Sequence, residues 1–436
     1  MQEAATGVAM CMARRTGVFF GWRVVGAAFV LAFLGWGIGF YGPPIYLLAI
    51  QENRGWPVAL ISTAVTSHFV IGAVVVAKLP TLYIRFGVPV TTKAGAISLA
   101  VGILGWASAT APWQLFVATL FSGAGWAAMG AAAVNAIVSP WFVRTRPAAL
   151  SMAYNGASIG GVVFSPLWVA GISVLGFPLA AAAIGIVMTL TMWVLADRLF
   201  SRTPREMGLR PDGDARLTAV ASIPSLAAQS VPGSLLWHDM KFLTLSAGMA
   251  LGLFAQIGLI THLFSLLAPA LGPQPAALAM GMATISAIAG RTLVAWLMPP
   301  EADRRVVASA SYAVQIAGSI MFILAAGSSA PLLFLGVVLF GAGIGNATSL
   351  PPLIAQVQFP ENDVPRVVAL TVAVAQAAYA FAPATFGLVR EFAPHSTGTA
   401  SSAAPGVFAA AAFAQGLAIC AFLLGRYRLR TVSKSA

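Results

Sequence analysis

Long apolar runs alternate with short polar segments along the whole chain. Each run has about 20 residues or more, the length that a helix needs to cross the hydrocarbon core of a bilayer. No run alternates polar and apolar residues as a membrane β-strand does, and a helix satisfies its own backbone polar groups in lipid. The pattern therefore predicts an all-α membrane protein with twelve transmembrane helices, at residues 22–50, 57–81, 90–110, 113–139, 147–172, 177–197, 241–269, 276–298, 306–327, 331–355, 366–389 and 403–425.

Composition and charge support this interpretation. Of the 436 residues, 59% are hydrophobic and only 8% are charged, against about 25% charged residues in soluble domains. All 24 Lys and Arg residues except Arg54, Arg291 and Arg390 fall in the tails, in the connections on one side or at the adjoining helix ends. Because basic residues favour the cytoplasmic side, we expect both termini there. This asymmetry accounts for the net charge of +12, so no nucleic-acid partner is expected.

Little in the sequence indicates cofactor, metal or enzyme chemistry. The two cysteines, Cys11 and Cys420, lie far apart, and no Cys/His cluster accompanies them, so we expect neither a disulfide nor a metal site. There is no P-loop, which argues against ATP-driven transport by this chain. With no nucleophile–base pair and no sizeable soluble domain, an enzyme is not expected. No cleavable signal peptide is predicted either, and the first span is expected to act as an uncleaved targeting signal.

The longest polar stretch divides the apolar runs into six and six. We expect an N-terminal six-helix half at residues 1–200, a cytoplasmic linker at 201–240 and a C-terminal half at 241–436. Residues 146–151 and 366–371 each begin with Arg and contain Ala-Leu before Ser or Thr, a weak internal repeat between the halves. Two pseudo-symmetric halves with a site between them near mid-membrane are typical of secondary transporters. Proline pairs at 43–44 and 351–352 are expected to kink spans 1 and 10.

Arg291 is the one basic residue well inside a predicted span. Insertion of such a charge costs roughly 2.5–3.5 kcal/mol even on a lenient scale, and all twelve acidic residues lie in tails, loops or extreme helix ends. Snorkelling toward the headgroups is one interpretation. The alternative, which we favour, is that Arg291 faces a central cavity and binds the carboxylate of a substrate, since a guanidinium matches a carboxylate in bidentate geometry.

Other polar residues at mid-span are further candidates for substrate binding. For each of them helix packing is the competing interpretation. His68 and His262 are also candidates for proton coupling, because histidine is the side chain in these spans that titrates near neutral pH. In addition to Arg291, the candidates for substrate binding are Tyr41, Asn155, His262, Gln376 and Tyr379.

Several short motifs along the chain, taken in their order, resemble those of a known family. They are Phe20-Gly21-Trp22-Arg23 before span 1, Arg54-Gly55-Trp56 before span 2, Trp141-Phe142 with Arg144 and Arg146, Asn155 to Gly161, Thr203 to Gly213, and Gly290-Arg291. In this order they resemble the major facilitator superfamily, in particular its monocarboxylate-transporter-like and oxalate–formate-antiporter-like branch. The resemblance implies that spans 5 and 11 line a central cavity, which favours Asn155 and Gln376, and it points independently to Arg291.

Two departures limit what the resemblance implies. Ile84 stands where the superfamily usually has an Asp in the loop between spans 2 and 3, whereas Asp303 keeps an acid in the equivalent C-terminal loop. Animal monocarboxylate carriers have a span 8 Asp and a span 1 Lys, but here those places hold Ala287 and Pro43 or Pro44. The proton mechanism of that subgroup therefore does not transfer to this chain.

The sequence thus predicts a secondary active or facilitative transporter of small organic anions, acting as a monomer in the cell inner membrane by alternating access. A monocarboxylate is favoured, because nothing basic lies between Arg366 and Arg390, where some dicarboxylate-handling relatives have a second basic residue. Anion exchange, facilitated diffusion and proton symport stay open. The alternatives are a drug or metabolite exporter of the same superfamily and a non-transporting membrane receptor of the same fold.

Overall fold

The computed structural model describes residues 19–213, 236–299, 301–360, 363–392 and 405–435. These residues are almost entirely helical, and no strand occurs among them. The all-α fold predicted from the sequence is therefore confirmed. The helices are α2 (Phe20–Gly39), α3 (Pro43–Arg54), α4 (Val58–Ser108), α5 (Pro112–Ala128), α6 (Ala131–Val138), α7 (Arg146–Leu175), α8 (Phe177–Leu195), α10 (Met240–Leu271), α11 (Pro273–Leu297), α12 (Arg304–Ala325), α13 (Ala330–Ile344), α14 (Asn346–Gln358), α15 (Val364–Ala380), α16 (Ala382–Phe392) and α17 (Pro405–Ser435). Short helical turns η1 (Ser139–Trp141), η2 (Ala196–Phe200) and η3 (Pro211–Gly213) complete the described elements.

Eleven helical stretches in the described residues are long and apolar enough to cross a membrane. One of them, α4, has 51 residues and a non-helical residue, Gly87 (φ 78°, ψ 161°), inside it. At 1.5 Å per residue α4 would be about 77 Å long if it were straight, more than twice the hydrocarbon thickness. Glycine adopts this positive φ without steric cost. The stretch therefore contains predicted spans 2 and 3, joined at Gly87, and the eleven stretches account for all twelve predicted spans.

Four of the predicted spans are broken into two helices; one of them is span 11, which breaks at Phe381, between α15 and α16. Span 1 breaks between Gly39 and Pro43, and the prolines occupy the first turn of α3, where proline is tolerated. The predicted kink at Pro43-Pro44 is thus confirmed. In span 10 the helix breaks at Gly345, while Pro351 and Pro352 lie inside α14, so the kink at this proline pair stays a prediction. Span 4 also breaks, at Met129 and Gly130.

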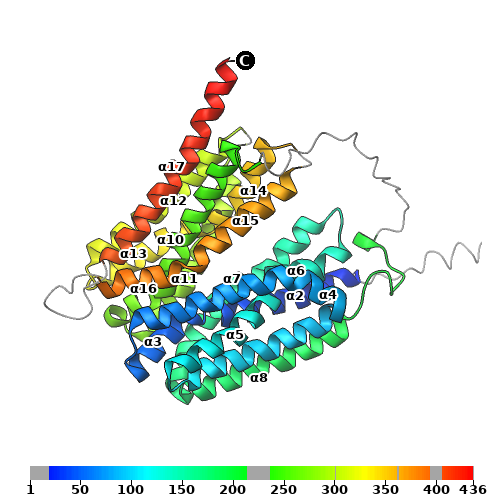
Figure 1. The fold of residues 1–436 in the computed structure, drawn as a ribbon, viewed down its shortest axis with the longest axis vertical. Coiled ribbons are helices and arrows are strands. Elements are labelled where there is room, and N and C mark those ends of the chain that lie inside the picture. The colour runs from blue at the N-terminus through cyan, green and yellow to red at the C-terminus, as the bar shows by residue number, and fades with distance from the viewer. Residues whose placement is uncertain (1–18, 214–235, 300, 361–362, 393–404, 436) are drawn as a thin grey trace, which may run out of the picture.

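The helices form two groups (Figure 1). In the first, α2 packs on α7, and α4 packs on α5 and α8; in the second, α10 packs on α15 and α17, and α12 packs on α13 and α17. Contacts between the groups join α7 with α11, α4 with α16, and α3 with α10. Figure 1 shows the groups lying against each other near α3 and α16 and diverging toward α6 and α14. The domain boundaries at residues 200 and 241 stay a prediction, and residues 214–235 of the linker lie outside the described residues.

Two hydrogen bonds join the groups at the end where they meet. The backbone N–H of Ala59 donates to Glu391 Oε2 at 3.1 Å, and that of Ala384 donates to Thr66 Oγ1 at 3.0 Å. Gly387 packs directly on Ser62, which a Cβ at residue 387 would approach to 2.6 Å. The start of α4 and the end of α16 are therefore in close contact, at the end of the helices that the predicted orientation places outside the cell.

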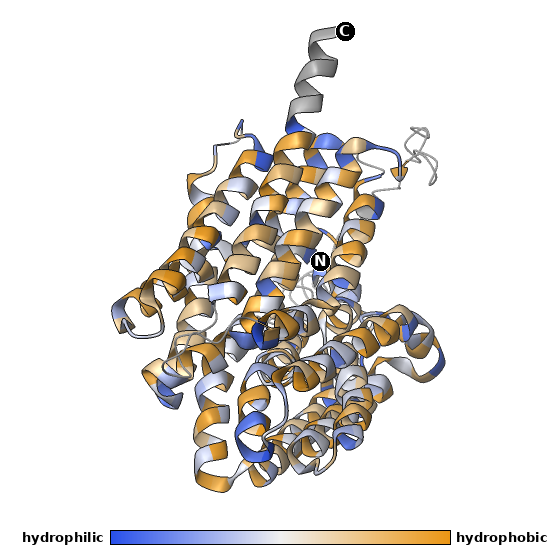
Figure 2. Ribbon diagram, turned by 60° about the vertical axis from the view of Figure 1, so that its left-hand side comes forward, coloured by the Kyte–Doolittle hydropathy of each residue, from blue (hydrophilic) through white to orange (hydrophobic). Residues whose placement is uncertain are grey.

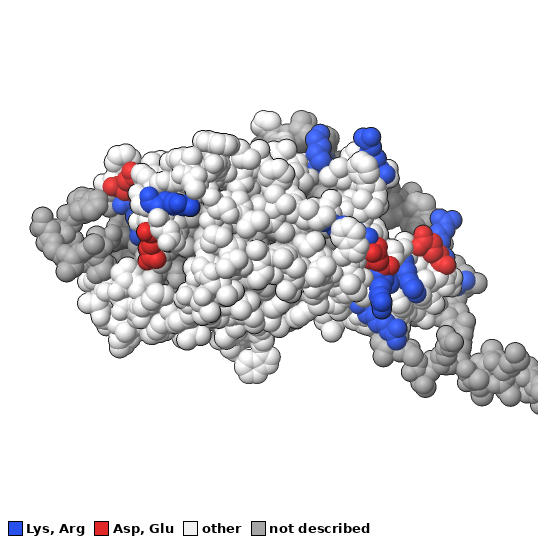
Figure 3. Space-filling model, turned by 90° about the horizontal axis from the view of Figure 1, so that it is seen from below, with Lys and Arg blue, Asp and Glu red and all other residues white. Residues whose placement is uncertain are grey.

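The surface has the polarity of a membrane protein. Hydrophobic residues run along the helices, with hydrophilic residues mainly near helix ends (Figure 2). In the face seen from below, Lys, Arg, Asp and Glu gather at the two ends, separated by an uncharged middle (Figure 3). The end on the right of that view carries more Lys and Arg. A multi-pass membrane protein is the structure that this distribution requires.

Candidate functional site

Arg291 lies on the inner face of α11. Side chains seven and four residues apart share a helix face, which groups Arg291 with Thr284 and Ala287. Both of these are buried, whereas Ile285 and Trp296, on the opposite side of α11, are 52% and 81% exposed, as expected for side chains in lipid. Arg291 itself is exposed, although it does not share the lipid-facing side of its helix.

The broken span 10 holds one side of the Arg291 guanidinium. Arg291 Nε donates to the backbone carbonyl of Gly345 at 3.0 Å. Gly345 lies at the break between α13 and α14, and Ser349 Oγ donates to the same carbonyl at 3.2 Å. No hydrogen bond from either terminal nitrogen of Arg291 to a described residue is present, and no carboxylate of the described residues pairs with it. The two terminal nitrogens therefore remain as donors for a ligand.

Three glycines allow span 10 to approach α11 this closely. A Cβ added at Gly290 would lie 2.1 Å from the carbonyl oxygen of Ala342, one at Gly341 would lie 2.5 Å from that of Ala283, and one at Gly345 would lie 2.1 Å from that of Ala287. Small residues permit such backbone approach between membrane helices. The hydrogen bond between Arg291 and Gly345 depends on this approach, because the broken backbone must reach the side chain.

Tyr41 reaches the same place from the first group of helices. It lies in the break between α2 and α3, and its hydroxyl interacts with the side chain of Thr284 and with the charge of Arg291. Its ring packs on Gly161 of α7, where a Cβ would lie 2.5 Å from the ring. The structure thus brings together Arg291 and Tyr41, two of the residues predicted from the sequence, one from each half.

Asn155, Gln376 and Tyr379 lie on the other helices that face between the groups. Asn155 is exposed on α7, seven residues before Val162, whose backbone packs on Gly281 of α11. Tyr379 and Gln376 are half-buried on α15, and the Tyr379 ring contacts Phe69 of α4 with centroids 6.1 Å apart. Their part in binding stays a prediction.

The two histidines are fully buried in helix contacts. His262 Nε2 lies 3.1 Å from the Pro383 carbonyl, which can only accept, so this nitrogen carries the hydrogen. His68 Nδ1 lies 2.8 Å from Ser122 Oγ, between α4 and α5. His262 Nδ1 and His68 Nε2 are buried, and no described residue forms a hydrogen bond with either atom. Neither ring is exposed beside Arg291, and the role of both in proton coupling stays a prediction.

Arg390 is a polar residue of the interior that the sequence analysis missed. It lies at the end of an apolar run, outside the group of basic residues expected on the cytoplasmic side, and its Nη1 donates to the buried Ser265 Oγ at 2.6 Å. Ser265 in turn donates to the carbonyl of His262 at 2.8 Å. A basic residue at the end of an apolar run can turn its side chain outward to water or inward to the helices. The sequence contains no signal that distinguishes these two orientations for Arg390.

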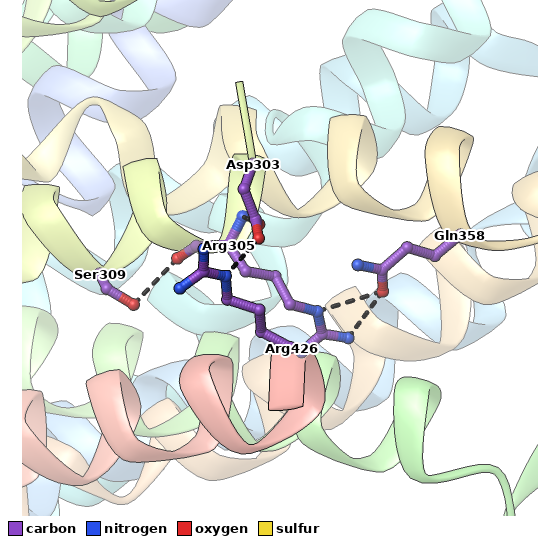
Figure 4. A network of polar contacts seen from close by, with 5 residues as sticks. All are labelled: Asp303, Arg305, Ser309, Gln358 and Arg426. Carbon is purple, nitrogen blue, oxygen red and sulfur yellow. Dashed lines mark hydrogen bonds and ion pairs between the residues drawn. The ribbon is translucent and has the colours of Figure 1, made fainter. Parts of the chain in front are cut away.

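A polar network ties four helices of the second group together at the opposite end from Arg390 (Figure 4). Arg305 is fully buried and donates to Gln358 Oε1 from Nε and Nη2, at 3.1 and 2.8 Å. It also donates to Thr244 Oγ1 at 3.0 Å and to the Lys241 carbonyl at 2.9 Å. These bonds connect α12 to α14 and α10.

Asp303 adds α17 to this network. Its Oδ1 accepts from the backbone N–H of Arg305 at 3.0 Å and caps α12, while its Oδ2 accepts from Arg426 Nε at 2.6 Å. The acid that the sequence retains in this loop is thus an ion-pair and capping residue. In the first group, where Ile84 replaces the corresponding acid, Lys93 pairs instead with Asp197 of η2.

Asp212 fastens the segment after span 6 to the loop before α7. Its carboxylate accepts the backbone N–H groups of Val143, Arg144 and Thr145 at 3.0, 2.9 and 3.1 Å, and the Thr145 hydroxyl at 2.5 Å. Burial by itself raises the pKa of Asp212, but the hydrogen bonds from Thr145 and the backbone outweigh it and lower the pKa to about 2. Hydrogen bonds to the charged form have this effect.

The described residues contain no cluster of three or more His, Cys, Asp or Glu residues that could hold a metal ion. Cys420 is a free, exposed thiol, and Cys11 lies outside the described residues.

Residues 19–383 match the sequence profile of the Major Facilitator Superfamily. The chain belongs to the Major Facilitator Superfamily. No curated protein matches it in sequence.

Solved structures of this superfamily's fold resemble the chain over almost its whole length. The nucleoside transporter NupG matches with a TM-score of 0.69 and 13% identity, covering 94% of this chain and 99% of that one. A D-xylose–proton symporter matches at 0.68 and 14% (92% and 96% covered), and a bacterial homologue of the human lysosomal transporter Spinster at 0.66 and 14% (93% and 96%). At these identities the likeness shows a shared fold. Superfamily membership and this fold support membrane transport of a small molecule.

Proposed function

We propose that the protein transports small organic anions, with monocarboxylates as the favoured class, and that Arg291 pairs with the substrate carboxylate. The observation that carries this proposal is the environment of Arg291: a guanidinium on the inner face of a membrane helix, held through Nε by Gly345, with two terminal nitrogens lacking any described partner. A planar fork of this kind matches a carboxylate in bidentate geometry. Tyr41, from the other group, lies close enough for its hydroxyl to interact with the charge of Arg291.

The arrangement of the helices supports alternating access to this site. The groups are in contact near α3 and α16 and diverge at the other end (Figure 1). With the predicted orientation, the contact end faces outside and the diverging end faces the cytoplasm. Rocking of the groups about their contacts would expose Arg291 to each side in turn, as in two-half transporters.

The monocarboxylate and oxalate–formate branch suggested by the sequence motifs fits this proposal. Arg291 is the basic residue at mid-span, and Arg390, the next candidate for a second one, is turned to Ser265. One cation favours one carboxylate. Transport measurements decide whether the protein exchanges anions, couples their transport to a proton gradient or does neither. His68 and His262, the candidates for carrying a proton, are both buried in helix contacts.

The test is binding and counterflow with purified protein. Thermal-shift screening of organic acids identifies a ligand, and Arg291→Ala should weaken it about 30- to 150-fold, because truncating one partner of a hydrogen-bonded charge pair costs about 2–3 kcal/mol at a partly exposed site. Arg54→Ala, which removes an exposed charge at the end of α3, is the matched control and should change nothing.

Counterflow of the labelled acid in proteoliposomes then separates a transporter from a receptor. Accumulation that depends on Arg291 supports the proposal. Binding without counterflow would identify a receptor, and transport of cations or neutral drugs in preference to acids would identify an exporter.

A further inference from the structure

Four aromatic side chains form a continuous row beside the candidate site. We call them the aromatic wall: Trp36 and Phe40 of the first span, Trp126 of α5 and Tyr154 of α7. Ring centroids lie 6.1 Å apart between Phe40 and Trp126, 5.0 Å between Trp126 and Trp36, and 6.2 Å between Trp36 and Tyr154. These separations are those of interacting aromatic pairs.

The aromatic wall faces the interior of the protein. Each of its four side chains is only partly buried, yet none of the large hydrophobic side chains of residues 20–54 is exposed, in contrast to α8, where Leu179, Ile186 and Leu190 are about 60% exposed to the lipid side. On α5, Trp126 lies opposite Phe121, which is 44% exposed. The partial exposure of the wall is therefore toward the space between the helix groups.

Glycines of neighbouring helices fix the position of the Trp126 indole. A Cβ at Gly39 would lie 2.8 Å from this ring, and one at Gly72 would lie 3.2 Å from it. The ring thus fits between α2 and α4 with little room to move. A held indole presents a constant aromatic surface to whatever lies in front of it.

The wall is continuous with the residues that surround Arg291. Phe40 contacts the next residue, Tyr41, with centroids 5.0 Å apart, and Tyr41 interacts with Thr284 and with the charge of Arg291. A ligand whose carboxylate pairs with Arg291 and passes Tyr41 therefore meets Phe40 and Trp126 next.

The indole N–H groups of the wall have no partner within the described part of the chain. Trp106 and Trp168, which are fully buried, donate to Ser122 Oγ at 3.0 Å and to the Gly37 carbonyl at 3.3 Å, whereas no hydrogen bond involves the N–H of Trp36 or Trp126. Buried or half-buried indoles normally find an acceptor. Two free donors in an aromatic surface are suited to a polar atom on an otherwise apolar ligand.

We propose that the substrate is an aryl carboxylate: one carboxylate on a planar aromatic ring, which stacks on the aromatic wall while Arg291 holds the charge. This inference rests on the proposed function, because it needs the carboxylate at Arg291. Each aromatic contact contributes roughly 2- to 12-fold in affinity. An aromatic acid should bind about tenfold more tightly than an alicyclic acid of the same size.

The test compares benzoate, cyclohexanecarboxylate and acetate by calorimetry on the purified full-length protein. Benzoate should bind about tenfold more tightly than cyclohexanecarboxylate, and acetate most weakly. Trp126→Leu should abolish the preference between the two rings and keep binding of both. The matched control is Trp193→Leu, since Trp193 is 45% exposed on the lipid side of α8 and its loss should leave the preference unchanged.

The outcomes separate this inference from the function on which it rests. Equal binding of benzoate and cyclohexanecarboxylate by the wild-type protein, with both lost in Arg291→Ala, would overturn the aryl preference and leave anion transport standing. A benzoate preference that persists in Trp126→Leu would also overturn it. Acid binding that is insensitive to Arg291→Ala would refute the proposed function itself. The wild-type comparison requires no variant to fold.

Discussion

Replacing Arg305 by methionine removes the centre of the network in Figure 4. The Arg305 guanidinium is fully buried and makes four hydrogen bonds, to Gln358, Thr244 and the Lys241 carbonyl. Methionine has a similar length and fills the space without donating. Four net hydrogen bonds from a charged donor would sum to more than about 6 kcal/mol, but the burial of the guanidinium offsets part of this.

The expected loss follows from the groups left behind. Three acceptors lose their donor, and each costs about 1–3 kcal/mol where water does not replace it. We therefore expect Arg305→Met to lower the free energy of unfolding by about 3–5 kcal/mol. Arg304→Met is the matched control one residue away: Arg304 donates a single hydrogen bond, from Nη1 to the Leu353 carbonyl at 3.1 Å, and its loss should cost about 1 kcal/mol.

The measurement is unfolding by sodium dodecyl sulfate in mixed micelles, followed by tryptophan fluorescence. The reasoning is refuted if Arg305→Met lies within about 1 kcal/mol of Arg304→Met. Such a result would mean that water replaces the guanidinium and that the four helices do not depend on it.

Three further predictions follow from other contacts. The amides of residues 143–145 should exchange hydrogen faster in Asp212→Asn than in the wild type at pH 7. The difference should vanish as the pH falls from about 4 to about 2. The reason is that the pKa of Asp212 is lowered from 3.8 to about 2 on folding, so the stability that its carboxylate contributes is complete above pH 3.8 and is lost below about pH 2. An unchanged exchange rate at pH 7 would contradict this. Gly290→Ala should destabilise by about 1–3 kcal/mol through overpacking, whereas Gly26→Ala, with nothing within 4 Å of the new Cβ, should not, as thermal unfolding will show. If transport is driven by a proton gradient, replacing both His68 and His262 should abolish that drive in proteoliposomes; uptake that still follows the gradient would exclude them as the proton carriers.

The sequence predicted the spans well, because hydrophobic length is a direct consequence of bilayer thickness. It also predicted that Arg291 has no acid within reach, since that required only the positions of twelve acidic residues. The break in span 1 followed from Pro43 and Pro44. The position of the break in span 10 did not, because the helix is interrupted at Gly345, whereas Pro351 and Pro352 are accommodated inside α14.

What the sequence could not give are contacts between distant helices. The direction of the Arg390 side chain depends on Ser265, 125 residues away. The aromatic wall combines residues of three helices whose relative rotation is set by glycine contacts. No periodicity within one helix encodes which partner its inner face will meet, so Trp36 and Trp126 were indistinguishable from packing residues.

The close contact between the backbones of α11 and α13 limits the residues that homologous proteins can have at this contact. Gly290, Gly341 and Gly345 each leave a carbonyl oxygen of the facing helix 2.1–2.5 Å from where a methyl group would start. A homologous chain with a larger residue at any of the three must separate these helices and release the arginine from its backbone anchor. The residues that a relative has at these three positions and at the position of Arg291 therefore distinguish relatives that can bind a ligand in this geometry from relatives that must bind it in a different geometry.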